Sequence, residues 1–166
     1  MKFRLGKGFG LKMETTADVP AVIPQVSRIL VATDFSVQAR NALAWARRLA
    51  DALGAKLVLL HVINIFSLAE MGCAMEGGID PLGLVREQSQ KCIAELKSQF
   101  PDLETIIREG APRPMIIDAA RELNCQLIVM GTHGRSGLAH LLLGSVAEYV
   151  VRHSSVPVLT IRLHQK

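Results

Sequence analysis

Short apolar runs alternate with amphipathic stretches along most of the chain. Five runs have the length and the content of leucine and β-branched residues that are typical of buried strands: 28–33, 56–62, 103–108, 126–130 and 156–162. Four stretches between them carry apolar residues at helical spacing: 37–53, 81–100, 114–123 and 145–153. This alternation predicts the α/β class, a single open parallel sheet with helices on both faces.

Local signals set the expected boundaries of these elements. Ser36 is a natural N-cap for the first helix, and Gly54 occupies the position that commonly ends one. Residues 63–79 form a long connection rich in glycine and methionine, and glycines and prolines interrupt the first 26 residues. We expect an extension over 1–26 and one domain over 27–166. In such a sheet a ligand binds beyond the carboxyl ends of the strands, where the connections diverge. The strand order stays open at this point.

Composition and charge exclude several classes of function. The net charge is +4, of which the extension carries half, so the domain is close to neutral and lacks the cationic face that nucleic acid requires. Aromatic residues make up only 4% of the chain, too few for a base-stacking platform. No apolar run approaches the ~18 residues of a membrane helix. Because there is also no secretory signal, we expect a cytoplasmic protein with no membrane contact. The three cysteines show no C-x-x-C spacing.

The most distinctive segment follows the fourth apolar run. It begins with Gly-Thr-His-Gly-Arg-Ser-Gly from Gly131, and a glycine-serine pair, Gly144-Ser145, opens the next helix. Glycines let the backbone approach a ligand, and backbone amides in such turns and at helix N-termini bind anions. This favours a site for a chain of phosphates. Each glycine taken alone has an ordinary reading as a turn residue, and Arg135 fits a phosphate contact and a solvated charge equally well.

Other motifs for phosphate or acyl chemistry do not occur. The sequence has no Walker-type phosphate loop, no dinucleotide-binding G-x-G-x-x-G after the first run, and no G-x-S-x-G elbow. Asp34 ends the first run, where it can serve a ligand or begin an Asx turn. His133 fits a loop residue better than a general base, because no partner is assignable to orient it. We expect His61 and Trp45 to be core residues, like Cys92 and Cys125.

The chain resembles the universal stress protein family. Gly131-x-x-Gly134, nine further residues and then Gly144-Ser145 match the nucleotide-binding signature of that family's ATP-binding branch. Three other segments are similar to the family as well: Ile29–Ser36, Leu60–Val62 and Ser155–Leu159. The likeness extends over about residues 27–162.

The resemblance implies a Rossmann-like sheet of order 3-2-1-4-5, related to the adenine nucleotide alpha hydrolases, that binds ATP, ADP or AMP with Mg²⁺. Asp34 would contact the ribose or the metal ion, and Val62 would meet adenine through its backbone. The expected binding residues, with Arg135 added on charge, are Ala32, Thr33, Asp34, Val62, Met130, Gly131, Gly134, Arg135, Gly144, Ser145 and Val146.

The resemblance also implies a homodimer that pairs through the last strand, Val156 to Ile161. The leading interpretation is a nucleotide-dependent regulatory module of the stress response, with slow or no ATP hydrolysis, because no residues are assignable that position an attacking water. Two alternatives stay open. One is an enzyme of related fold, a weak ATPase or adenylate transferase, and the other is a partner-docking protein with a vestigial site.

Overall fold

The computed structural model of the protein describes residues 25–70, 80–133 and 143–162, with the side chains of 68–70 excepted. The elements within these residues are, in chain order, β1 (Arg28–Thr33), α1 (Val37–Leu53), β2 (Lys56–Ile63), α2 (Ile65–Glu70), α3 (Pro81–Gln99), β3 (Glu104–Glu109), α4 (Pro112–Glu122), β4 (Leu127–Gly131), α5 (Ser145–His153) and β5 (Val158–Ile161).

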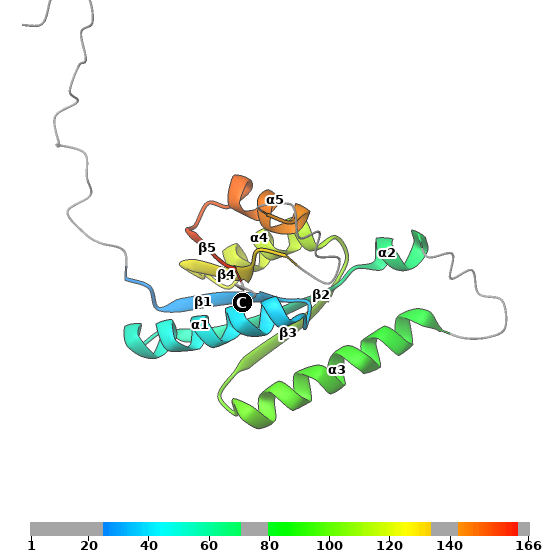
Figure 1. Cartoon of the computed structure of the whole chain (residues 1–166), viewed down its shortest axis with the longest axis horizontal. Coiled ribbons are helices and arrows are strands. Elements are labelled where there is room, and N and C mark those ends of the chain that lie inside the picture. The colour runs from blue at the N-terminus through cyan, green and yellow to red at the C-terminus, as the bar shows by residue number, and fades with distance from the viewer. Residues whose placement is uncertain (1–24, 71–79, 134–142, 163–166) are drawn as a thin grey trace, which may run out of the picture.

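All paired strands of the sheet run parallel, in the order β3-β2-β1-β4-β5. This confirms the α/β class and the order that the family resemblance implies. The run that precedes α4 forms an edge strand of the sheet, β3. Figure 1 shows α1 and α3 on one face of the sheet and α4 and α5 on the other, as right-handed crossovers require.

The sheet divides the core into two layers, and the side chains of β1 alternate between them. Ile29 and Val31 face α1, whereas Leu30 and Ala32 face α4 and α5, and all four side chains are buried. A strand buried on both faces reads as a continuous apolar run, which is why the sequence pattern identifies it. No helix in the described ranges is long and apolar enough to cross a membrane.

Helix α1 begins and ends where its caps predict. The Ser36 hydroxyl accepts a 3.2 Å hydrogen bond from the Ala39 amide, and Gly54 adopts a left-handed φ of 65°. The buried stripe consists mainly of alanines, so the helix lies close against β1 and β4. Trp45 lies outside this stripe and is 54% exposed, so the prediction that it is a core residue is wrong.

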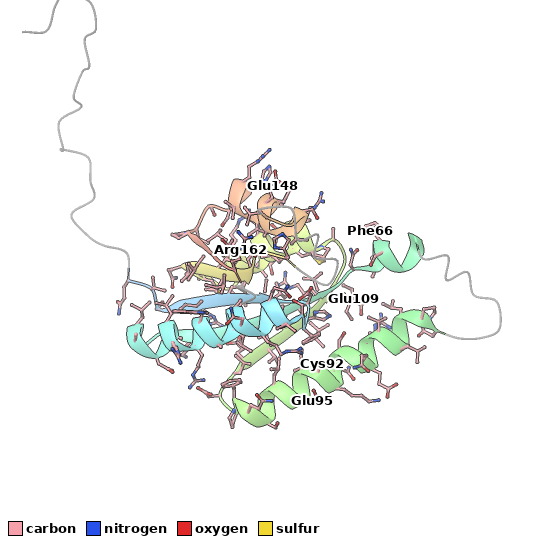
Figure 2. The ribbon with its side chains drawn as sticks, viewed as in Figure 1. Phe66, Cys92, Glu95, Glu109, Glu148 and Arg162 are labelled. Atoms are coloured by element: carbon pink, nitrogen blue, oxygen red, sulfur yellow. The ribbon has the colours of Figure 1, made fainter. Side chains whose placement is uncertain are left out.

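Two further details differ from the sequence prediction. The connection after β2 contains a helix, α2, whose Phe66 is exposed (Figure 2). Helix α3 buries Ser89 and Ile93, and Leu96 near its C-terminal end packs against the core layer that faces α1. Cys125 is a core residue as predicted, whereas Cys92 on α3 is only half-buried.

Candidate functional site

The central strands β1 and β4 lie side by side and their connections diverge. Ala32 is in register with Met130, and Thr33 and Gly131 follow at the carboxyl ends of the two strands. The chain leaves β1 through α1 toward β2, and it leaves β4 through α5 toward β5, on opposite faces. This divergence is the switch point at which open α/β sheets bind ligands.

Side chains from Thr33 to Ser36 shape the turn between β1 and α1. The Phe35 amide donates a 3.0 Å hydrogen bond to the Thr33 hydroxyl, and the Ser36 amide donates one of 3.0 Å to Asp34 Oδ1. Asp34 therefore does form the Asx turn that was one of its two sequence interpretations. The turn also holds the half-exposed Asp34 carboxylate at the carboxyl end of the sheet.

Phe35 has a left-handed backbone with φ of 64°. For a bulky residue such a conformation costs about 1–3 kcal/mol and persists only where surrounding contacts hold it. The Phe35 ring is 9% exposed and lies 4.4 Å from the His61 ring, centroid to centroid. His61 is itself buried, and its Nδ1 lies 2.9 Å from the Thr33 carbonyl oxygen. The prediction that His61 is a buried, hydrogen-bonded core residue is thus confirmed.

Two glycines of the predicted signature allow close backbone packing. A Cβ at Gly131 would lie 3.1 Å from Gln38 Cβ, so a larger residue there would require α1 to shift by a few tenths of an ångström. The Gly144 amide donates a 2.8 Å hydrogen bond to the Thr132 carbonyl oxygen, and a Cβ at Gly144 would lie 3.3 Å from that oxygen. Gly144 therefore brings the start of α5 against the end of β4.

The N-terminus of α5 faces this edge of the sheet without a side-chain cap. Gly144 is the N-cap residue, and no described side chain accepts a hydrogen bond from the first turn. Ser145 is exposed at the first helical position, and Val146 packs against the core. Amides at such a helix start carry partial positive charge and bind anions.

The remaining predicted residues contribute in different ways. The side chains of Ala32 and Met130 are 8% and 6% exposed and belong to the core, so only their backbones reach the edge. Val62, on β2, is half-buried against the same core layer. Gly134 and Arg135 lie outside the described residues.

Sequence reasoning did not assign Phe35, Gln38 or Thr132 to the site. The local sequence gives no signal for these three residues. Each of them shapes the site through contact with a residue that is distant in sequence or through an unusual φ. His133 follows Thr132, and its Nδ1 lies 3.1 Å from the Thr132 hydroxyl oxygen. The His133 Nε2 atom is buried and has no hydrogen-bond partner among the described residues.

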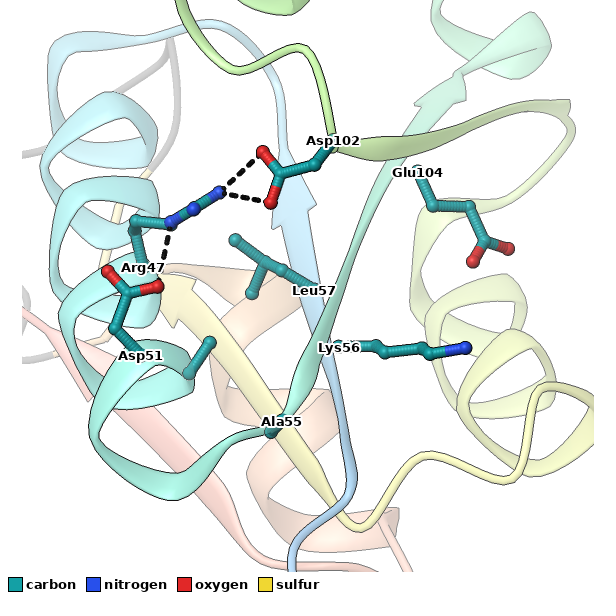
Figure 3. Close-up of a pocket in the computed structure, with 8 residues that line it drawn as sticks. Arg47, Asp51, Ala55, Lys56, Leu57, Asp102 and Glu104 are labelled. Atoms are coloured by element: carbon teal, nitrogen blue, oxygen red, sulfur yellow. Dashed lines mark hydrogen bonds and ion pairs between the residues drawn. The ribbon is translucent and has the colours of Figure 1, made fainter.

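One pocket in the described structure lies at the opposite, amino edge of the sheet (Figure 3). It has a volume of about 410 Å³, and Arg47 spans it with hydrogen bonds of 2.8 and 3.0 Å to the Asp102 carboxylate and an ion pair of 3.0 Å to Asp51. The hydrogen bond from Arg47 lowers the pKa of the Asp102 carboxyl below its ordinary value. These contacts join α1 to the turn that precedes β3, so we interpret them as structural.

A second, smaller hollow of about 160 Å³ runs along α5 from Ser145 to His153, with Arg113 of α4 beside it. No group of three His, Cys, Asp or Glu side chains that could hold a metal ion occurs among the described residues, in these pockets or elsewhere. The candidate site is therefore defined by the backbone arrangement at the β1–β4 edge.

Comparison with known proteins agrees with this fold. Residues 25–162 match the model of the Universal stress protein family, and the chain belongs to that family. It is 30% identical to Universal stress protein MJ0531 of Methanocaldococcus jannaschii over 84% of each chain. It is 34% identical to Universal stress protein YxiE of Bacillus subtilis, over 82% of this chain and 99% of the relative. The solved structure of MJ0577 superposes with a TM-score of 0.73 at 28% identity, covering 86% of this chain and 100% of that one.

Proposed function

We propose that this chain binds ATP or another adenine nucleotide, together with Mg²⁺, at the carboxyl edge of β1 and β4. One observation carries the proposal: the hydrogen bond between Gly144 and Thr132 sets the uncapped start of α5 beside the switch point. The matching glycine spacing and the membership in the universal stress protein family support it.

The residues at this edge fit a magnesium nucleotide. A Cβ would make tight contacts at Gly131 and Gly144, of 3.1 and 3.3 Å, and without one the backbone at both positions allows a ligand to approach closely. The first amides of α5 and the Ser145 hydroxyl would donate hydrogen bonds to phosphate oxygens. The Asp34 carboxylate supplies the oxygen type that Mg²⁺ prefers. When bound, the cation would offset the repulsion between Asp34 and the phosphates.

The proposed role is a nucleotide-dependent regulatory module in the stress response, with slow or no hydrolysis. Among the described residues, His133 is the candidate general base at the end of β4. Its Nε2 is buried, and its Nδ1 lies 3.1 Å from the Thr132 hydroxyl oxygen. One ring nitrogen is thus buried and the other lies within hydrogen-bond distance of Thr132, so neither is placed as a general base. This supports binding in preference to turnover.

We further propose a homodimer paired through β5. This strand forms one edge of the sheet, and within the described residues no strand pairs with its outer side, whose backbone groups can add a second strand. Pro157 precedes the strand, in keeping with an edge position.

Calorimetric titration of the purified chain with ATP, with and without Mg²⁺, tests the function. We expect saturable binding that Mg²⁺ strengthens, and no phosphate release on the timescale of seconds. Steady phosphate release would favour the enzyme alternative, and a folded chain that fails to bind millimolar ATP would favour the docking protein. Mass spectrometry of the ligand that co-purifies identifies which adenine nucleotide the site selects.

A further inference from the structure

Phe35 directly follows Asp34, the proposed metal ligand, and has a conformation that its own side chain disfavours. Its φ is 64°, in the left-handed region that glycine or asparagine adopts far more readily than phenylalanine. A turn of this kind relaxes unless neighbouring groups hold it. The contacts that hold Phe35 therefore also hold Asp34.

Contacts on both sides of Asp34 come from one buried side chain of the neighbouring strand. His61 stands opposite Thr33 in the β1–β2 register. Its Nδ1 lies 2.9 Å from the Thr33 carbonyl oxygen, and since that oxygen can only accept, Nδ1 carries the hydrogen. The His61 ring also packs against the Phe35 ring at 4.4 Å, with the planes inclined by 40°. His61 thus contacts the residue before Asp34 and the residue after it.

We propose that His61 and Phe35 are positioning residues that orient Thr33 and Asp34 for the magnesium nucleotide. This inference rests on the proposed function of the same edge of the sheet. Neither residue needs to touch the ligand. His61 fixes the carbonyl on one side of Asp34, and the buried Phe35 ring holds the left-handed backbone on the other. The Asp34 side chain is then directed by its hydrogen bond from the Ser36 amide.

A role in core packing alone predicts a different result. If the two rings only fill space, their replacement lowers the stability of the domain but leaves the nucleotide affinity of the folded protein unchanged. If they position the turn, the affinity falls as well, and variants that restore the lost hydrogen bond or relieve the left-handed strain recover it.

Four variants of the full chain separate these roles. His61→Leu fills similar space with an apolar side chain and removes the hydrogen-bond donor. His61→Asn places an amide N–H near the position of Nδ1. Phe35→Ala removes the ring and retains the unfavourable φ, whereas Phe35→Gly removes the ring and adopts that φ without strain. Leu57→Val, a buried change at the far end of β2, serves as a control for general loss of packing.

The experiment combines calorimetric affinity for ATP with Mg²⁺ and hydrogen exchange of the Phe35 and Ser36 amides in the nucleotide-free protein. We expect His61→Leu and Phe35→Ala to weaken binding about tenfold and to lose protection at both amides. His61→Asn and Phe35→Gly should recover most of that loss, and Leu57→Val should bind like the wild type.

The outcomes separate this inference from the proposed function. Wild-type affinity and intact amide protection in His61→Leu and Phe35→Ala, in a chain that binds ATP, overturn the positioning role alone. Loss of affinity that neither His61→Asn nor Phe35→Gly restores also overturns it. Absence of ATP binding by the wild-type chain overturns the proposed function and this inference together.

Discussion

The amide of Gly144 donates a 2.8 Å hydrogen bond to the carbonyl oxygen of Thr132, which joins the start of α5 to the end of β4. A Cβ at position 144 would lie 3.3 Å from the same oxygen. The absence of a side chain at Gly144 therefore matters twice: it permits this hydrogen bond, and it leaves the helix start open to an anion.

Gly144→Ala should weaken both the fold and the proposed site. The added methyl group pushes α5 away from Thr132, and we expect a loss of about 1–3 kcal/mol in the free energy of unfolding together with weaker ATP binding. Urea unfolding and calorimetry measure the two effects. Gly54→Ala is the matched control, because Gly54 has a φ of 65° and no atom within 4 Å of the added Cβ. It should lose about 1 kcal/mol of stability and keep the wild-type affinity.

Ser145→Ala should reduce ATP affinity with little effect on stability. The residue is exposed, so the free energy of unfolding should change by less than about 0.5 kcal/mol. A hydrogen bond to a charged phosphate contributes about 1.5–3 kcal/mol, so we expect binding to weaken about tenfold or more. Ser155→Ala, at an exposed serine before β5, is the control. Equal affinities for the Ser145→Ala variant and the wild type would remove Ser145 from the site.

Acid should destabilise the fold in part through Asp102. The hydrogen bond from Arg47 lowers the pKa of this carboxyl in the folded state. The resulting stabilisation is complete above the ordinary aspartate pKa of about 4 and is lost as the pH falls through the lowered value. The urea midpoint of Asp102→Asn should therefore decrease less than that of the wild type when the pH is lowered from about 5 to about 3, the range in which carboxylates titrate.

Asp118→Asn is the control for this titration, since its ion pair with Arg121 is longer, at 3.5 Å, and lies within α4. An acid dependence for Asp102→Asn that matches the wild type would contradict the interpretation of the Arg47 contacts as a stabilising link between α1 and β3.

Thr160→Pro should dissociate the proposed dimer without unfolding the domain. Pro157 and Ile161 direct their carbonyl oxygens to β4. The backbone groups of Thr160 therefore point to the open edge, because the direction alternates along a strand. Light scattering should give twice the chain mass of 18.1 kDa for the wild type and the single mass for the variant. Thr160→Val keeps the amide and should remain dimeric. A monomeric wild type would rule out pairing through β5.

Trp45 is the single tryptophan of the chain and provides a direct test of the α1 packing. With 54% of its surface exposed, its fluorescence in the folded protein should be quenched readily by acrylamide. Trp45→Gln should change the free energy of unfolding by less than about 1 kcal/mol, whereas Leu43→Ala, on the buried side of α1, should cost about 2–5 kcal/mol. Strong protection of Trp45 from the quencher would contradict this placement of the helix.

The sequence alone predicts much of the fold. The apolar runs identify the strands because both faces of the central strands are buried, and Ser36 and Gly54 mark the ends of α1 because capping depends on adjacent residues. The glycine spacing and the neighbouring segments likewise suffice to recognise the family. Each of these signals is local or periodic and needs no knowledge of which elements are neighbours.

The tertiary structure decides which side chains act together. It leaves Trp45 exposed, places Gln38 against Gly131, and packs His61 against the turn that contains Asp34. These contacts join residues of different elements, and a period or a cap signal carries no information about them. The left-handed backbone of Phe35 is a further case, because its cost is offset by contacts with a neighbouring strand and not by anything in its own segment.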